Sequence, residues 1–155
     1  MITNTRSNAF NSNTYFGSTI FGDDVTYQIQ QVALPGISMA HQAEATKVGY
    51  IHLQGDIAEY DSIRLTVLVD EKLVVWKELI TIMQKYHVPG TNLCNPITGD
   101  SWIEIRDNRN NYLFKLELKN SYIKSIGSVT YATNGDNEII TVDVDMVFDY
   151  FLIVD

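Results

Sequence analysis

Two aspartates near the end of the chain have the residue type and spacing that acid–base or metal chemistry uses. Asp143 and Asp145 alternate with apolar residues, so both carboxylates project from one side of a predicted strand, as paired carboxylates do in glycosidases and metal sites. Alternating acids on a solvent-facing strand explain the pair equally well, and no third residue with a matching role is evident. A small β-sandwich binding module or hydrolase that uses these two residues therefore stays open as one alternative function.

The other nucleophilic and metal-binding residue types are scattered along the chain. His41, His52 and His87 lie far apart, in none of the spacings that hold zinc. Cys94 is the only cysteine, has no His or Lys within a few residues, and cannot form an intramolecular disulfide, as expected of a protein made in a reducing cytoplasm. Phosphate-binding glycine motifs and a GxSxG motif are absent from the sequence. We therefore expect no enzyme activity, no cofactor and no metal.

The composition describes one acidic globular domain. The 155 residues are 45% hydrophobic and only 19% charged, which provides a core. Eleven Lys and Arg against 19 Asp and Glu give a formal charge of -8, which argues against a surface that grips nucleic acid. After Lys124 no Lys or Arg occurs, so the last strand is predicted to be an acidic edge or face. Residues 1–22 carry one charge and no apolar run, so neither a signal peptide nor membrane insertion is expected.

The first part of the chain is weakly patterned. Residues 1–22 are rich in Asn, Ser and Thr but contain four aromatic residues, which predicts an N-terminal arm that is disordered or orders against a neighbouring subunit. In residues 25–34 apolar and polar side chains alternate, and the apolar positions then shift by one residue. This pattern predicts a strand with a bulge before Pro35-Gly36. Residues 37–47 are predicted to be a loop or a short helix. Residues 47–56 are predicted to be a strand that ends in a turn at Gly55-Asp56.

The later segments have clearer periods. Residues 62–69 alternate as a half-buried strand, and residues 71–86 then switch to helical spacing, with Asp70 as the expected N-cap. Further strands are predicted at 101–107, 112–118, 121–131 and 139–154. The sum is mainly β: an antiparallel β-sandwich or barrel of about seven strands with one flanking α-helix, in a single domain over 23–155.

Three stretches of this pattern resemble the tail tube proteins of contractile-tailed bacteriophages. The first is Ala33-Leu34-Pro35-Gly36 followed by Val48-Gly49-Tyr50 and Gly55-Asp56. The second is YDSIRLTVLVDE, a strand that leads into the helix with Trp76, and the third is the terminal EIITVDVDMVFDYF. Their order and spacing extend over about 130 residues.

The resemblance implies a structural protein of the virion tail, made in the cytoplasm of the host. Tail tube subunits form hexameric rings whose inner sheets join into one barrel, and the rings stack inside a contractile sheath above a baseplate. DNA passes through the channel without specific binding. The alternatives within this class are a baseplate protein that initiates the tube and the tube subunit of a type VI secretion or other contractile injection system.

Two sets of site residues follow from these expectations. Unpatterned apolar segments need a partner surface, so contacts between rings are expected from the arm and from the connection 35–60; the candidates are Phe16, Phe21, Leu34, Ile37, Met39 and Tyr60. An acidic channel wall repels DNA, so lumen-facing acids are expected on the hairpin and the last strand; the candidates are Asp143, Asp145, Glu104 and Glu117. Lys115 and Arg106 share the outward faces of the hairpin, which favours the last strand.

Overall fold

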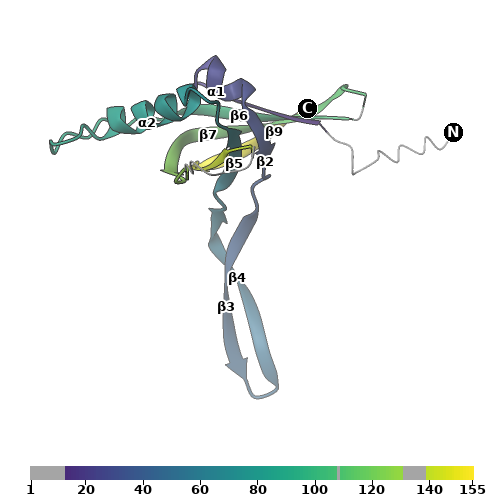
Figure 1. Ribbon diagram of the computed structural model, residues 1–155. Coiled ribbons are helices and arrows are strands. Elements are labelled where there is room, and N and C mark those ends of the chain that lie inside the picture. Colours follow the sequence, from purple (N-terminus) through teal and green to yellow (C-terminus); the bar gives the residue numbers. More distant parts are fainter. Residues whose placement is uncertain (1–12, 108, 131–138) are drawn as a thin grey trace.

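The computed structural model describes residues 13–107, 109–130 and 139–155 of the chain (Figure 1). In chain order the elements are β1 (Asn13–Ser18), α1 (Asp23–Tyr27), β2 (Ile29–Val32), β3 (Ile37–Thr46), β4 (Gly49–Tyr60), β5 (Ile63–Leu68), α2 (Val74–Tyr86), β6 (Gly99–Arg106), β7 (Tyr112–Ile126), β8 (Thr141–Val147) and β9 (Tyr150–Val154). The predicted mainly β, antiparallel fold with a flanking helix is confirmed, with more strands than expected and a second, short helix.

Strand β7 is long enough to belong to two sheets. Its first half pairs with β6 and β9, and β6 also pairs with β1; we call these four strands sheet A. Its second half pairs with β8, which continues through β5 to β2; we call these sheet B. All of these pairs are antiparallel. The described strands do not close into a barrel, so the arrangement is the sandwich-like one of the two predicted alternatives.

The core lies between the inner faces of the two sheets. On β5 and β8 the predicted alternation is confirmed, because Leu65 faces Val144 and Ile63 faces Met146 across the ladder, and all four are fully buried. Ile103 of β6 and Leu118 of β7 supply the corresponding side chains of sheet A. Burying one such side chain stabilises the fold by about 1.5–3 kcal/mol.

Part of the expected N-terminal arm is a strand of sheet A. Residues 13–18 pair along their whole length with β6, and Phe16 and Phe21 are only 6% and 8% exposed in the core. These two aromatic side chains explain why the segment is ordered, since they bury apolar area that a solvated tail would leave in water. Residues 1–12 of the expected arm lie outside the described residues.

The connection predicted as a loop or short helix is instead one strand of a long hairpin. β3 pairs with β4 from Ile37 opposite Tyr60 to Thr46 opposite Gly49, and the hairpin projects away from the two sheets (Figure 1). The turn expected at Gly55-Asp56 is a bulge, because β4 continues to Tyr60 while the register shifts between Met39 and His41. A Cβ on Gly55 would lie 2.6 Å from the Ala40 carbonyl oxygen, so this close approach requires glycine.

Two further strand boundaries differ from the sequence prediction. The predicted strand 25–34 begins too early, because residues 25–27 belong to helix α1 (Asp23–Tyr27). Only residues 29–32 pair with β5, with the predicted irregularity between Ile29 and Gln31. The predicted strand 139–154 is interrupted at Phe148-Asp149, so β8 belongs to sheet B while β9 turns to pair with β7 in sheet A. The interruption is what gives sheet A its fourth strand.

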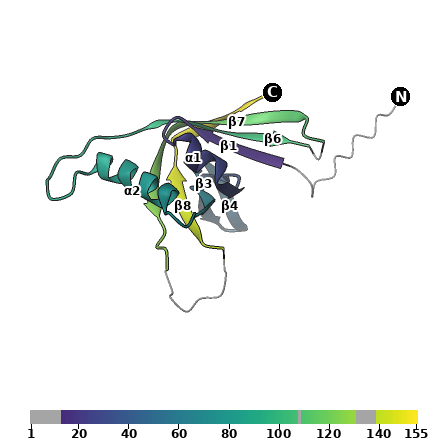
Figure 2. The ribbon, with the colours of Figure 1, turned by 45° about the horizontal axis from the view of Figure 1, so that its top comes forward.

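Helix α2 lies beside the sheets with α1 against it (Figure 2). It begins at Val74, three residues later than predicted, because Leu73 takes a left-handed conformation with φ of 56°. The N-cap position is therefore Leu73 and not the predicted Asp70, but the Asp70 Oδ1 still accepts hydrogen bonds from the backbone N–H groups of Val74 at 2.9 Å and Val75 at 3.4 Å in the first turn. Val75 and Leu79 are the buried residues of the helix.

Candidate subunit interfaces

Sheet A ends in a free strand edge on each side. Among the described residues β1 pairs with β6 alone and β9 pairs with β7 alone, so each presents one row of backbone N–H and C=O groups without a strand partner. β9 also exposes large apolar side chains, with Leu152 and Ile153 among the most exposed. An apolar free edge is a template for pairing with a second chain.

Paired charges cover the outer face of sheet A. Glu104 accepts a hydrogen bond from Arg106 at 2.9 Å, and Glu117 contacts the ammonium groups of Lys115 at 3.0 Å and Lys119 at 3.3 Å. Lys119 also reaches Asp100 at 3.3 Å, so three acids alternate with three bases. Hydrogen bonds from Lys115, and to a smaller extent from Lys119, lower the pKa of Glu117. Hydrogen bonds to Asp100, and to a smaller extent to Glu117, raise the pKa of Lys119. The ion-paired acids and bases of this face are therefore equal in number, and Glu117 and Lys119 are each favoured in the charged form by their partners.

Aromatic rings border this ladder of ion pairs. The Arg106 guanidinium carbon lies 5.0 Å from the centre of the Tyr15 ring, a cation–π contact between β6 and β1. Trp102 lies directly over Gly17 of β1, where an added Cβ would meet the indole ring at 2.3 Å. The two contacts hold the edge strand β1 against the sheet.

Asp143 and Asp145 lie on the outer face of sheet B, on a different sheet from Glu104 and Glu117. Asp145 accepts hydrogen bonds from Arg64 Nε at 2.9 Å and from Ser125 at 3.2 Å, while Asp143 accepts one from Thr66 at 3.2 Å. The hydrogen bond and charge of Arg64 lower the pKa of Asp145 below its ordinary value. A carboxylate held in its ionised form is a poor proton donor at neutral pH, so Asp145 does not suit the general-acid role in glycoside hydrolysis.

The candidates for contacts between rings divide between surface and core. Leu34, Ile37 and Met39 are 54%, 54% and 43% exposed, at the base of the β3–β4 hairpin. Tyr60 lies opposite Ile37 and packs against Phe148 and Phe151, with ring centres 5.8 Å and 5.4 Å apart. Phe16 and Phe21 are buried within their own subunit, so Leu34, Ile37 and Met39 are the exposed members of this set.

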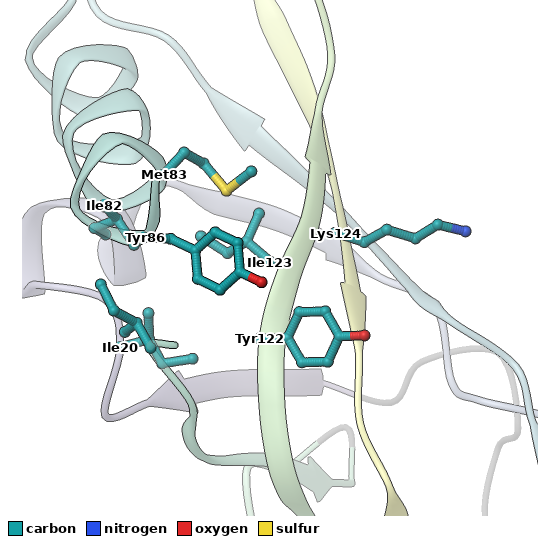
Figure 3. Close-up of a pocket in the computed structure, with 8 residues that line it drawn as sticks. Ile20, Ile82, Met83, Tyr86, Tyr122, Ile123 and Lys124 are labelled. Carbon is teal, nitrogen blue, oxygen red and sulfur yellow. The ribbon is translucent and has the colours of Figure 1, made fainter. Parts of the chain in front are cut away.

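An apolar pocket opens where the end of α2 faces β7 (Figure 3). It has a volume of about 170 Å³ and is lined by Ile82, Met83 and Tyr86 of the helix and by Tyr122 and Ile123 of β7, together with Ile20, Ile97 and Lys124. The Lys124 side chain extends away from the helix side of the pocket. Within residues 13–107, 109–130 and 139–155, no group of three or more His, Cys, Asp or Glu side chains is placed to hold a metal.

Solved structures show which known fold this arrangement matches. A chain from the sheath/tube terminator of an extracellular contractile injection system, PVC, in its extended state aligns with a TM-score of 0.65 over 95% of both chains, at 15% identity. A chain from the extended PVC sheath–tube complex aligns with a TM-score of 0.60 over 97% of this chain and 93% of the other, at 14% identity. The chain has the fold of contractile-injection tube proteins.

Hcp1 from Flavobacterium johnsoniae shares the tube fold, with a TM-score of 0.52 over 90% of this chain and 93% of its own, at 12% identity. No protein-family model and no curated protein sequence matches the chain. Helices long and apolar enough to cross a membrane are absent from the described part of the chain. The resemblance to tail and secretion tubes is therefore confirmed at the level of the tube fold.

Sequence reasoning missed the two surfaces that the tube fold leaves open. The β9 edge was hidden in one long predicted strand, because Phe148, Asp149 and Tyr150 continue the alternation of apolar and polar residues past the point where the strand breaks. The strand predicted at 47–56 corresponds to most of β4, but β3 and the hairpin that it forms were missed. Nearly all residues of the hairpin are exposed, so neither face has the apolar period that marks a half-buried strand.

Proposed function

We propose that this protein is a structural subunit of the inner tube of a contractile tail or injection system. The two free edges at opposite sides of sheet A carry the proposal. A head-to-tail contact between two different edges repeats from copy to copy and forms a ring when the rotation between neighbouring copies closes. In this arrangement β9 of one copy pairs with β1 of the next, and the resemblance to phage tail tubes gives six copies per ring.

The outer face of sheet A then lines the channel. The ion pairs of Glu104 with Arg106 and of Glu117 with Lys115 and Lys119 remain hydrated in a water-filled channel, whereas a dry subunit contact would remove these charges from water, which is unfavourable. Glu104 and Glu117 are accordingly the lumen-facing acids of the proposal. Asp143 and Asp145, on sheet B, face outward or toward a neighbour.

The β3–β4 hairpin supplies the contacts between stacked rings. It projects from the body and exposes Ile37 and Met39, next to the exposed Leu34 (Figure 1). Burial of such apolar side chains against a second ring is favourable by about 25 cal/mol per Å². The sheath surrounds the tube and the baseplate supports it, so proteins of these two parts are the other proposed partners.

A charge-balanced channel suits passage of DNA without specific binding. Arg106, Lys115 and Lys119 of the proposed wall each have an acidic neighbour, so these cations are already paired and are less available to neutralise phosphates and release counterions. The proposed location is the virion tail of a bacteriophage, with the tube of an injection or type VI secretion system and a tube-initiating protein as the alternatives.

Cysteine cross-linking tests the proposed edge pairing. In a Cys94→Ser background, Tyr15→Cys on β1 is combined with one cysteine on β9. The three β9 positions tested in turn are Tyr150→Cys, Leu152→Cys and Val154→Cys. They lie on the same face of the sheet, and together they cover the possible registers between β1 and β9 of the next copy. Paired strands bring Cα atoms within the 4.4–6.8 Å that a disulfide needs. We expect at least one combination to give a ladder of disulfide-linked multimers that ends at six.

Tyr15→Cys with Thr141→Cys is the matched control, because Thr141 lies on β8 in sheet B. This control should remain monomeric on a denaturing non-reducing gel. The absence of multimers from all three β9 combinations, or equal multimers from the control, would overturn the proposal.

A further inference from the structure

The outer half of the β3–β4 hairpin has two chemically different faces. His41 and Ala43 of β3 share a face with His52 and Gln54 of β4, because His41 pairs with Gln54 and Ala43 pairs with His52. We call this the imidazole face; Ala45 and Tyr50 complete it toward the tip. The two imidazole rings lie next to each other, with centres 6.0 Å apart and planes inclined by 49°.

The charged side chains of the hairpin lie mostly elsewhere. Glu44 pairs with Ile51 and Glu59 pairs with Ser38, so both alternate onto the opposite face, and Lys47 lies in the turn between the strands. Asp56, in the bulge of β4, is the one carboxylate that alternation brings to the side of the histidines, and no ion pair joins it to either imidazole in the described structure. From His41 to Gln54 the imidazole face therefore carries no formal charge while both imidazoles are neutral.

A second copy of this chain is the occupant that fits the imidazole face. The hairpin projects away from both sheets (Figure 1), and β3 and β4 contact each other far more than any other element, so the chain's own body does not cover the face. At its base the same surface reaches Tyr60, which packs on Phe148 and on Phe151 of β9, the strand whose edge is proposed to pair with the next subunit. The imidazole face is thus continuous with the proposed interface between copies.

We propose that His41 and His52 make contacts between copies of this chain dependent on pH. The inference rests on the proposed tube function. Imidazole ordinarily changes its charge near pH 6.5, so acidification places two like charges side by side on a face that carries no other charge between His41 and Gln54. When a second copy docks on the imidazole face, the two charges lose contact with water, and no acidic side chain of the hairpin is paired with them. Subunits with protonated imidazoles therefore dissociate from each other. The tube is stable at neutral pH and comes apart below about pH 6.

The fold of the subunit persists through this pH range. The carboxylates with lowered pKa, Asp107, Glu117 and Asp145, contribute stability that is present above the unfolded-state pKa of about 4 and is lost only as pH falls below it. Dissociation between pH 7.5 and 5.5 is therefore separable from unfolding, and circular dichroism should remain unchanged over that interval.

Sedimentation of assembled protein at pH 7.5 and pH 5.5 tests the inference. If an imidazole must lose its proton before two copies can dock, the association constant falls by up to about tenfold for each pH unit below the ordinary imidazole pKa. We therefore expect the wild type to shift from large assemblies at pH 7.5 to free subunits or small oligomers at pH 5.5. The His41→Gln/His52→Gln double variant should remain assembled at pH 5.5. His52→Lys, which fixes one positive charge on the face, should weaken assembly even at pH 7.5.

Two matched variants serve as controls. His87→Gln removes the third histidine, which lies after α2 and not on the hairpin, and Asp56→Asn removes the nearby carboxylate; both should still dissociate at pH 5.5. If the wild type and the double variant dissociate over the same pH range, or if the wild type stays assembled at pH 5.5, the pH inference is overturned while the tube function stands. A wild type without assemblies at pH 7.5 would overturn both.

Discussion

Three serines form a buried row across the core side of sheet A. Ser101 on β6 donates to Ser18 on β1 at 2.8 Å and shares a hydrogen bond of 2.5 Å with Ser121 on β7, whose hydroxyl also reaches the Gly99 carbonyl oxygen at 2.8 Å. Buried polar groups need such partners because an unsatisfied hydroxyl costs about 1–3 kcal/mol. The row therefore favours one register for three neighbouring strands, including the edge strand β1.

At the residue scale, we predict that Ser101→Ala destabilises the subunit by about 1–3 kcal/mol, since it removes the central member and leaves its neighbours with fewer partners. The midpoint of thermal unfolding should fall by roughly 2–4 °C per kcal/mol for a chain of this size. Ser62→Ala, at an exposed position, is the control and should stay within about 0.5 kcal/mol of wild type in urea unfolding. Equal stability of the two variants would show that the row contributes nothing.

At the scale of elements, the parts with a buried face were predictable from sequence. Strand β5, helix α2 and the β6–β7 hairpin each bury alternate or helical apolar positions, so the period appears in the residues themselves. The β3–β4 hairpin exposes both faces, and β1 is identified by its tertiary contacts with β6 and not by a local period. The same reason explains why Phe16 and Phe21 were expected at a subunit contact.

The start of α2 provides the test at this scale. Asp70→Ala should destabilise the subunit by about 1 kcal/mol, because the N–H groups of Val74 and Val75 lose the carboxylate that accepts their hydrogen bonds. Asp70→Asn keeps an acceptor oxygen in the same place and should cost less. Urea unfolding of both variants measures the difference, and an Asp70→Ala protein as stable as wild type would contradict the capping role.

At the scale of the whole molecule, two kinds of surface are left without a partner within the chain: the strand edges of sheet A and the β3–β4 hairpin. The edges of β1 and β9 bound one sheet on opposite sides, and the hairpin extends away from the body (Figure 1). The three stretches that resemble tail tube proteins are what predicted the tube fold from the sequence, since the composition and the scattered acids and histidines alone identify no role. Which acids share a face depended on tertiary structure, since β7 places Glu117 on sheet A while Asp143 and Asp145 belong to sheet B.

An electron microscopy reconstruction of the purified protein assembled at pH 7.5 tests the central claim most directly. We predict closed rings, stacked into tubes, in which β9 of each subunit lies beside β1 of the next and Glu104 and Glu117 face the channel. Protein that remains monomeric across a wide range of concentration and salt, or rings with these two side chains on the outer surface, would contradict the account.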